Sequence, residues 1–429
     1  MTFHIETLGC KVNQTESAAV AELLHAHGLR RAEAEEKAAV VILNTCAVTG
    51  EASRKSRQAA RRLMRENSGA ALVISGCATQ LEPQWARDLG AILVSGSAGR
   101  RVLASRVVRI ALGEAPEPSP QSAAPLPRDL ERLPGGAAPG RTRAMLKIQD
   151  GCDNFCSYCV IPRIRGRVRS LPPPEIAAEA ARLSALGLRE IVLNGIEISS
   201  YGRDLPDASL IDAITAASAA APNARLRLTS LEPSTVTEEL CGALSGVPNL
   251  CDHFHLSLQS GSDGVLPRML RKYDTAGFFR ALSNLRSRFP NAGVTADLIC
   301  GFPGETDAQF DASLTFIGRC AFSDMHVFPY SARPGTPAAA MPDQIPHTIR
   351  RARARAAREL AETMRERFIA SQLGRTLPVL FERESGGRRI GYTGNYLEVS
   401  VSGALSRGDM LNVSLTRARG SEIFGELAE

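Results

Sequence analysis

Two stretches of alternating strand and helix patterns constrain the fold of this chain most strongly. In the first 112 residues, short apolar strands are each followed by a helix-like stretch; the strands read HIETLGC, VVILNTC, ALVISGC and AILVSGS. Such repeats favour a parallel sheet covered by helices. Because ligands of open α/β sheets bind at the carboxyl ends of the strands, the residues that follow these strands are candidate functional groups.

The second stretch covers residues 144–331 and contains six strand–helix units. Its strands read AMLKIQD, EIVLNGI, RLRLTSL, HFHLSLQS, GVTADLICGF and MHVFPYS. Six such units predict a partial (β/α)6 barrel with its chemistry at the strand carboxyl ends.

The remaining segments complete a prediction of the α/β class with three domains. Residues 113–140 are rich in Pro, Ala and Gly and predict a linker, and a long basic helical stretch (346–372) follows the barrel. The Gly-rich tail has short alternating strands that predict a small β-barrel. The predicted units are an N-terminal parallel α/β domain (1–112), the linker (113–140), the central barrel (141–372) and the C-terminal β-barrel (373–429).

Composition narrows the setting in which the chain works. A hydrophobic content of 44% and a charged content of 22% are typical of globular proteins. No run of about 18 uncharged apolar residues occurs, and the first residues lack the signal-peptide pattern, so we expect a cytoplasmic protein with no membrane contact. In that reducing compartment, 10 cysteines favour metal ligation or catalysis over disulfides.

Three cysteines gather in the sequence GCDNFCSYCVIP (151–162), directly after the first barrel strand. Disulfides need an even number of cysteines, and a structural zinc site needs four ligands. By contrast, Cys152, Cys156 and Cys159 can bind three irons of a [4Fe–4S] cluster and leave the fourth iron open for a small molecule. A zinc knuckle with a distant fourth ligand is the alternative.

A second set of thiols follows the first three strands of the N-terminal stretch. Cys10, Cys46 and Cys77 occupy equivalent strand ends, with Ser97 at the matching place on the fourth. Because parallel strands end at one edge of a sheet, these thiols are expected to converge and to hold a second cluster with an open iron. Three separate buried structural thiols are the alternative.

Other cysteines and histidines show no ligand spacing. We therefore predict packing roles for Cys241, Cys251, Cys300 and Cys320, and structural roles for His253 and His255.

Three segments hold several basic and no acidic side chains: RKSRQAARRLMR (54–65), RIRGRVR (163–169) and RRARARAAR (350–358). Their clustering predicts a polyanionic partner, most plausibly a nucleic acid, with solvated helix faces as the alternative. The predicted phosphate contacts are Arg54, Lys55, Arg57, Arg61, Arg62, Arg163, Arg165, Arg167 and Arg169.

Several motifs resemble a known family. The spacing C-x3-C-x2-C after a first barrel strand resembles the radical S-adenosylmethionine superfamily. The segments TLGCKVNQ (7–14), NTCAVTGEASRKSRQ (44–58) and SGCATQ (75–80) resemble the N-terminal domain of the methylthiotransferases. The middle of the chain resembles their radical core and the tail their TRAM domain, so the resemblance spans nearly the whole chain. Within the family, the first two segments resemble the tRNA N6-threonylcarbamoyladenosine branch, although Thr15 stands where we expect a tyrosine.

The resemblance also implies cofactor contacts. Tyr158 matches the aromatic residue that packs against adenine, and NGIEISSYG (194–202) stands where the superfamily binds the methionine amino group, although its match to a Gly-Gly-Glu pattern is incomplete. DLICGFPGET (297–306) resembles the motif beneath the adenine. The implied contacts are Tyr158, Asn194, Gly195, Glu197, Glu232, Gln259, Asp297 and Gly301, with loop-capping hydrogen bonds as the alternative role.

The activity that the resemblance implies is methylthiolation at carbon 2 of N6-threonylcarbamoyladenosine 37 in tRNA. It would use two [4Fe–4S] clusters and S-adenosylmethionine. The implied partners are the tRNA anticodon stem-loop and a low-potential electron donor such as flavodoxin or ferredoxin. The alternatives are a methylthiotransferase acting on isopentenyladenosine tRNA or on a ribosomal protein, and a non-catalytic iron–sulfur RNA-binding redox sensor.

Overall fold

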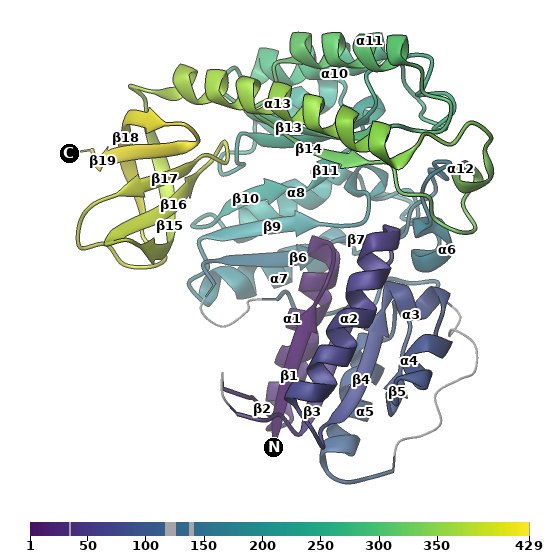
Figure 1. Ribbon diagram of the computed structural model, residues 1–429. Helices are drawn as coiled ribbons and strands as arrows, with labels where there is room; N and C mark the ends of the chain where they lie inside the picture. Colours follow the sequence, from purple (N-terminus) through teal and green to yellow (C-terminus); the bar gives the residue numbers. More distant parts are fainter. Residues whose placement is uncertain (34–35, 116–125, 137–140, 429) are drawn as a thin grey trace.

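The computed structural model describes residues 1–428 apart from 34–35, 116–125 and 137–140. Figure 1 shows an N-terminal domain at the bottom, a larger α/β core above it and a small β-barrel at the upper left. This arrangement confirms the predicted α/β fold class. Half of the predicted linker lies outside the described residues, and the domain boundaries stay predictions. In the described part of the chain, no helix is long and apolar enough to cross a membrane.

The N-terminal domain is a five-stranded parallel sheet in the order β2-β1-β3-β4-β5. Its strands are β1 (Thr2–Thr7), β2 (Arg30–Arg31), β3 (Val40–Thr45), β4 (Ala71–Gly76) and β5 (Leu93–Val94). Its helices are α1 (Lys11–Ala26), α2 (Gly50–Glu66), α3 (Cys77–Leu81), α4 (Gln84–Asp88) and α5 (Arg100–Ala111).

Strand β3 shows why the sheet is covered on both faces. Its side chains alternate, so Val40 and Ile42 pack with α1 and α5, whereas Val41 and Leu43 pack with α2 and α4. All six residues of the strand are buried. Helices therefore cover both faces of the sheet, and a functional site can form only at its edges.

The core contains two parallel sheets that continue one another. The first has the order β10-β9-β6 and the second β11-β12-β13-β14. Only Thr229 separates β10 from β11, so the six predicted strands form one open arc, as expected for a partial barrel. The strands are β6 (Arg143–Lys147), β9 (Glu190–Asn194), β10 (Arg225–Leu228), β11 (Ser230–Leu231), β12 (His253–Gln259), β13 (Gly293–Cys300) and β14 (Asp324–Pro329).

Helices follow and flank the strands of this arc. They are α6 (Ile161–Arg165), α7 (Pro173–Ala185), α8 (Leu210–Ala220), α9 (Glu238–Ser245), α10 (Thr275–Arg288), α11 (Asp307–Cys320), α12 (Pro337–Ala340) and α13 (His347–Gln372), with 3-10 turns η1 (Ile198–Ser200) and η2 (Pro233–Thr235). The long helix α13 runs across the top of the core and leads into the C-terminal barrel (Figure 1).

The C-terminal domain is a closed barrel in the order β15-β16-β17-β19-β18. Its strands are β15 (Thr376–Ser385), β16 (Arg388–Thr393), β17 (Glu398–Val401), β18 (Met410–Arg419) and β19 (Glu422–Leu427). The tail forms the small β-barrel that its short alternating strands predict, and closure removes the unpaired edges that a small open sheet would expose.

A short antiparallel ladder was not predicted. β7 (Gln149–Asp150) pairs with β8 (Arg169–Ser170) and closes the chain on both sides of the three-cysteine loop. The strands are two residues long, too short to leave an alternating pattern in the sequence.

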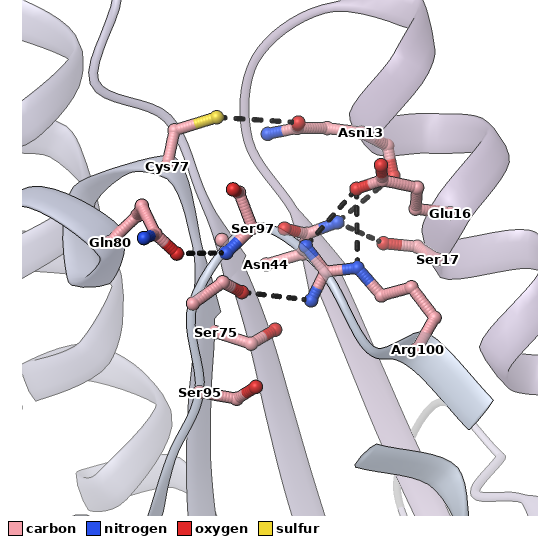
Figure 2. Close-up of polar contacts among 12 residues, drawn as sticks. Asn13, Glu16, Ser17, Asn44, Ser75, Cys77, Gln80, Ser95, Ser97 and Arg100 are labelled. Carbon is pink, nitrogen blue, oxygen red and sulfur yellow. Dashed lines mark hydrogen bonds and ion pairs between the residues drawn. The ribbon is translucent and has the colours of Figure 1, made fainter. Parts of the chain in front are cut away.

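A buried ionic network joins the N-terminal domain to the core. Glu16 on α1 is fully buried and accepts hydrogen bonds from Arg165 and Lys147 of the core, and from Arg100 on α5. Figure 2 shows Asn13 and Glu16 side by side on α1, with the Arg100 guanidinium at Glu16. Burial alone would raise the pKa of Glu16, but its cationic neighbours hold it well below the ordinary value.

We predict that Glu16→Gln lowers the free energy of unfolding by about 3–5 kcal/mol, because it leaves buried cations without their counter-charge. The pKa of Glu16 lies below that of the unfolded chain, about 4.3. Its contribution is therefore fully present above that pH and is lost as the pH falls toward the folded-state pKa. Urea unfolding at several pH values measures both effects.

Glu22→Gln on the same helix is the matched control. Glu22 pairs with Arg182 in a half-exposed position, so its loss is expected to change stability by less than about 1 kcal/mol. Equal effects of the two substitutions would contradict the role given to the buried network.

Candidate functional site

The three N-terminal thiols meet at the carboxyl edge of the sheet. Cys10 precedes α1, Cys46 follows β3 and Cys77 begins α3. The side-chain oxygen of Asn13 lies 3.9 Å from Cys10 Sγ and 3.8 Å from Cys77 Sγ (Figure 2 draws the Cys77 contact). Gly9 has φ +103°, and a Cβ there would lie 2.8 Å from Cys46 Sγ. The structure therefore brings the three thiols together, as the strand-end argument predicted.

The surroundings of these thiols suit a negatively charged group. Helix α1 has no side-chain cap at its first turn, so its backbone N–H groups and positive dipole end face this edge. Burial raises the pKa of Cys77 to about 11, although the Arg165 guanidinium, 3.6 Å from its sulfur, acts in the opposite direction. Burial likewise raises the pKa of Cys46. Such thiols stay protonated until a metal displaces the proton.

The second cysteine set lies on the loop between β7 and α6. Gly151 has φ +76°, and a Cβ there would overlap the carbonyl oxygen of Arg167. The Cys152 amide donates to Gly166 and the Cys159 amide to Cys156, so the loop folds back on itself. Burial is the main cause that raises the pKa of Cys152 to about 12, and Glu197 and the other two loop thiols act in the same direction.

Arg271 connects this loop to a predicted cofactor residue. Its guanidinium donates to Cys156 Sγ at 3.1 Å and to both carboxylate oxygens of Glu232 at 2.6 and 2.8 Å. Sequence reasoning missed Arg271, because its segment LPRMLRKYD has no motif that marks a sulfur contact.

Both cysteine sets fit an iron–sulfur cluster better than a single ion. Within the described ranges, no three His, Cys, Asp or Glu side chains are close enough to hold one metal ion. In a four-iron cluster each cysteine binds a different iron, so the sulfurs need not share one. Both sets contain only thiols, the soft ligands typical of such clusters.

A cavity of about 690 Å³ lies between the two domains and the C-terminal barrel. The N-terminal domain contributes Gly9 and Cys10, and the core contributes Gly195 and Asp297 from its strand ends. The C-terminal barrel contributes Tyr396. One space is thus open to both a predicted cluster ligand and predicted cofactor residues.

His253 and His255, whose structural roles remain predictions, both line this cavity. His255 Nε2 lies 3.2 Å from the Asp297 carboxylate. His253 is buried, yet neither of its ring nitrogens has a hydrogen-bond partner among the described residues. Burial, reinforced by Arg227, lowers its pKa far below the ordinary value, so it is neutral at pH 7. A buried imidazole without a partner is suited to hydrogen bonding with a ligand.

Four predicted cofactor residues lie near the loop or the cavity. Tyr158 packs against the apolar group of Val265, Met269 and Phe302. The Glu197 carboxylate accepts hydrogen bonds from Ser199 and Ser200 and raises the pKa of Cys152, which places it near the loop. Gly195 and Asp297 line the cavity, as given above.

Three other predicted residues have different surroundings. The Asn194 side chain is fully buried and donates to Thr15 Oγ1 at 2.7 Å, so it belongs to the domain interface and not to the cavity. A Cβ at Gly301 would overlap Arg350, and its amide donates to Glu305 at 2.7 Å. Gln259 ends β12 with φ 65°.

The basic segments divide into buried and exposed parts. Arg165 and Arg169 are buried and bonded within the protein, so the predicted phosphate contacts at these two positions are wrong. Arg163 and Arg167 are exposed. On α2, Arg54, Arg57 and Arg62 pair with nearby acids, as the solvated-face alternative expects. Lys55 and Arg61 are exposed and form no ion pair in the described structure.

The core and its three-cysteine loop define a radical S-adenosylmethionine protein. Residues 146–317 match the model of the Radical SAM superfamily, and residues 2–93 match uncharacterized protein family UPF0004. Among solved structures, the radical S-adenosylmethionine methyltransferase TsrM from Kitasatospora setae is similar in fold, with a TM-score of 0.58 and 16% identity over 79% of this chain and 75% of that one.

Relatives of known name cover almost the whole chain. The threonylcarbamoyladenosine tRNA methylthiotransferase MtaB of Bacillus subtilis is 35% identical over 97% of this chain and 94% of its own length. The MtaB of Thermotoga maritima is 36% identical over 89% of this chain and 86% of its own. The tRNA-2-methylthio-N(6)-dimethylallyladenosine synthase of Anaeromyxobacter dehalogenans is 34% identical over 99% and 94%.

The chain therefore belongs to the radical S-adenosylmethionine methylthiotransferase family, in the branch of the MtaB relatives. Membership assigns to the core S-adenosylmethionine and an iron–sulfur cluster.

We predict that Gly151→Ala opens the core cysteine loop, because its Cβ would overlap Arg167 and the φ value is unfavourable for alanine. The expected cost is about 1–3 kcal/mol of strain. Iodoacetamide should alkylate the buried Cys156 faster in the metal-free variant, as followed by mass spectrometry. Gly318→Ala, where no atom lies within 4 Å, is the control. An unchanged alkylation rate would contradict this role of Gly151.

Proposed function

We propose that the chain methylthiolates carbon 2 of N6-threonylcarbamoyladenosine 37 in tRNA, using two [4Fe–4S] clusters. The observation that carries this proposal is the shared cavity, with Cys10 on one side and Gly195 and Asp297 on the other. Methylthiolation needs a sulfur source and a hydrogen-abstracting group at one carbon, and a cavity lined both by a predicted auxiliary-cluster ligand and by predicted cofactor residues meets that need.

The proposed cofactors divide between the two cysteine sets. Cys152, Cys156 and Cys159 would hold the cluster that binds S-adenosylmethionine, and Cys10, Cys46 and Cys77 the auxiliary cluster. When bound, these groups supply the radical that removes hydrogen from carbon 2 and the sulfur that replaces it.

The chain's own residues position the reactants. Arg271 orients the core loop through Cys156, and Arg165 contacts Cys77 of the N-terminal set. The unpartnered nitrogens of His253 and the His255–Asp297 pair offer hydrogen bonds to a base.

The names of the relatives support the nucleoside. The MtaB relatives are named for threonylcarbamoyladenosine, and the segments TLGCKVNQ and NTCAVTGEASRKSRQ resemble that branch. The Anaeromyxobacter relative is named for dimethylallyladenosine, so that nucleoside is the second candidate. The proposal also requires a low-potential donor such as flavodoxin or ferredoxin, and a tRNA substrate places the activity in the cytoplasm.

We expect the two cysteine sets to be separable. Anaerobic reconstitution should give about eight irons per chain, and replacing Cys152, Cys156 and Cys159 by Ala should leave about four. With Cys10, Cys46 and Cys77 replaced by Ala, the enzyme should still form 5′-deoxyadenosine but no methylthio product. Mass spectrometry of nucleosides from reacted anticodon stem-loops identifies the product. Methylthiolation by a Cys46→Ala variant, or a product formed only on dimethylallyladenosine, would refute the proposal.

We expect the exposed cations of α2 to bind RNA phosphates. Lys55→Gln and Arg61→Gln should each flatten the slope of log affinity against log salt by roughly 0.7–0.9, the loss of one phosphate contact. Arg30→Gln is the control, because Arg30 pairs with Glu36 beside the amino end of the sheet. Fluorescence anisotropy across a salt series measures the slopes. If Lys55 and Arg61 behave like Arg30, the helix is only a solvated face.

A further inference from the structure

A second pocket, of about 370 Å³, adjoins the cavity between α1, β6 and the C-terminal barrel. Lys11, Gln14 and Tyr396 line both spaces, so they form the common wall. We call the second space the basic pocket, because its charged lining consists of one carboxylate, Glu382, and six cations. The cations are Lys11, Arg141, Arg143, Arg227, Arg383 and Arg407.

Tyr396 is held firmly in the common wall. Its backbone has φ 71°, and its ring stacks on His253 with the centroids 4.8 Å apart. The Arg227 guanidinium lies 4.7 Å from the ring centroid on a cation–π contact. Arg143 donates to the phenol oxygen at 3.3 Å, which leaves the phenol proton free to be donated to a ligand.

The charges of the basic pocket are not balanced within the protein. Arg143 pairs with Glu382, Arg227 with the buried Glu190, and Arg383 with Glu398. Lys11, Arg141 and Arg407 form no ion pair with any residue that the structure describes. Lys11, Arg141 and Arg407 are exposed, and three unpaired cations around one pocket produce a positive potential that attracts an anion.

The position of Lys11 connects this anion to the reaction. Lys11 directly follows Cys10 and lines both spaces, so a group bound by Lys11 lies next to the molecule that fills the cavity. The substrate of the proposed function carries a carboxylate a few bonds from its adenine ring. A ring in the cavity would direct that carboxylate past Tyr396 into the basic pocket.

We propose that the basic pocket binds the carboxylate of the amino-acid substituent on the target adenosine, through Lys11, Arg407 and the Tyr396 hydroxyl. This inference rests on the proposed function and deepens it, because it identifies how the nucleoside is selected. A dimethylallyl group carries no charge and would leave the cations without a partner, so the same pocket disfavours it.

Binding of anticodon stem-loops to the reconstituted full-length enzyme tests the inference. One RNA carries N6-threonylcarbamoyladenosine, and the second carries its neutral amide in place of the carboxylic acid. The wild-type enzyme should bind the acid roughly three- to tenfold more tightly, the value of a charge-assisted contact in a partly enclosed site. Lys11→Met and Arg407→Gln should each bring this ratio close to one in fluorescence anisotropy.

Two controls make the result specific. Arg419→Gln makes the same change at an exposed arginine of the same barrel, away from the pocket, and should keep the wild-type ratio. Iron content shows whether Lys11→Met retains its clusters next to Cys10, and Arg407→Gln tests the pocket from the C-terminal barrel, whose residues 373–429 include no cysteine.

Two outcomes would overturn the inference: equal binding of the two RNAs by the wild-type enzyme, or an unchanged ratio in both variants. An unchanged ratio with both RNAs bound more weakly would assign the pocket to a backbone phosphate. Failure of the proposed function is distinguishable, because the wild-type enzyme would then form no methylthio product on threonylcarbamoyladenosine, whatever the binding ratio.

Discussion

The ion pair between Glu16 and Arg165 is buried at the boundary between the N-terminal domain and the core, and the geometry of the site depends on it. The same guanidinium donates to Asn13 Oδ1 at 2.7 Å and lies 3.6 Å from Cys77 Sγ. Arg165 also ends α6, the helix that directly follows the core cysteine loop. One side chain thus connects the N-terminal cysteine set to the segment that carries the other set, so the distance between the two sets is fixed by charge and hydrogen bonds.

A second buried ionic network joins the C-terminal barrel to the core, as the network around Glu16 joins the N-terminal domain to the core. The buried Glu190 pairs with Arg225 and Arg227. These arginines also donate to barrel carbonyls, Arg225 to Tyr392 and Arg227 to Gly394, each at 2.9 Å. The loop that carries Tyr396 is thereby held over the mouth of the core. These two ionic networks fix the positions of the three domains. The cavity and the basic pocket are the spaces left between the domains.

Sequence reasoning predicted the features that are encoded locally. The strands of the core and the convergence of Cys10, Cys46 and Cys77 follow from apolar patterning and from the rule that parallel strands end at one edge. The two buried ionic networks were not predictable in this way, because they depend on pairing between residues that are distant in the sequence. Arg165 lies in a run of arginines that looks the same whether it is solvated or buried, and only its contact with Glu16, 149 positions away, decides its role. His253 presents a similar difficulty, because a histidine on a strand face gives no sign in the sequence of whether its ring nitrogens have partners.

Ionic contacts between the domains suit a site that is built from several domains better than apolar contacts would. Buried ion pairs contribute little net stability, because desolvation of the charges offsets much of their attraction. Apolar surfaces could pack in several nearby registers, whereas Glu16 is satisfied only when Arg100, Lys147 and Arg165 all reach it. We infer that the two ionic networks fix one arrangement of the domains and do not add stability. Chemistry at a single carbon requires reacting groups on separate domains to be placed within a fraction of an ångström, and a shift between registers would separate them.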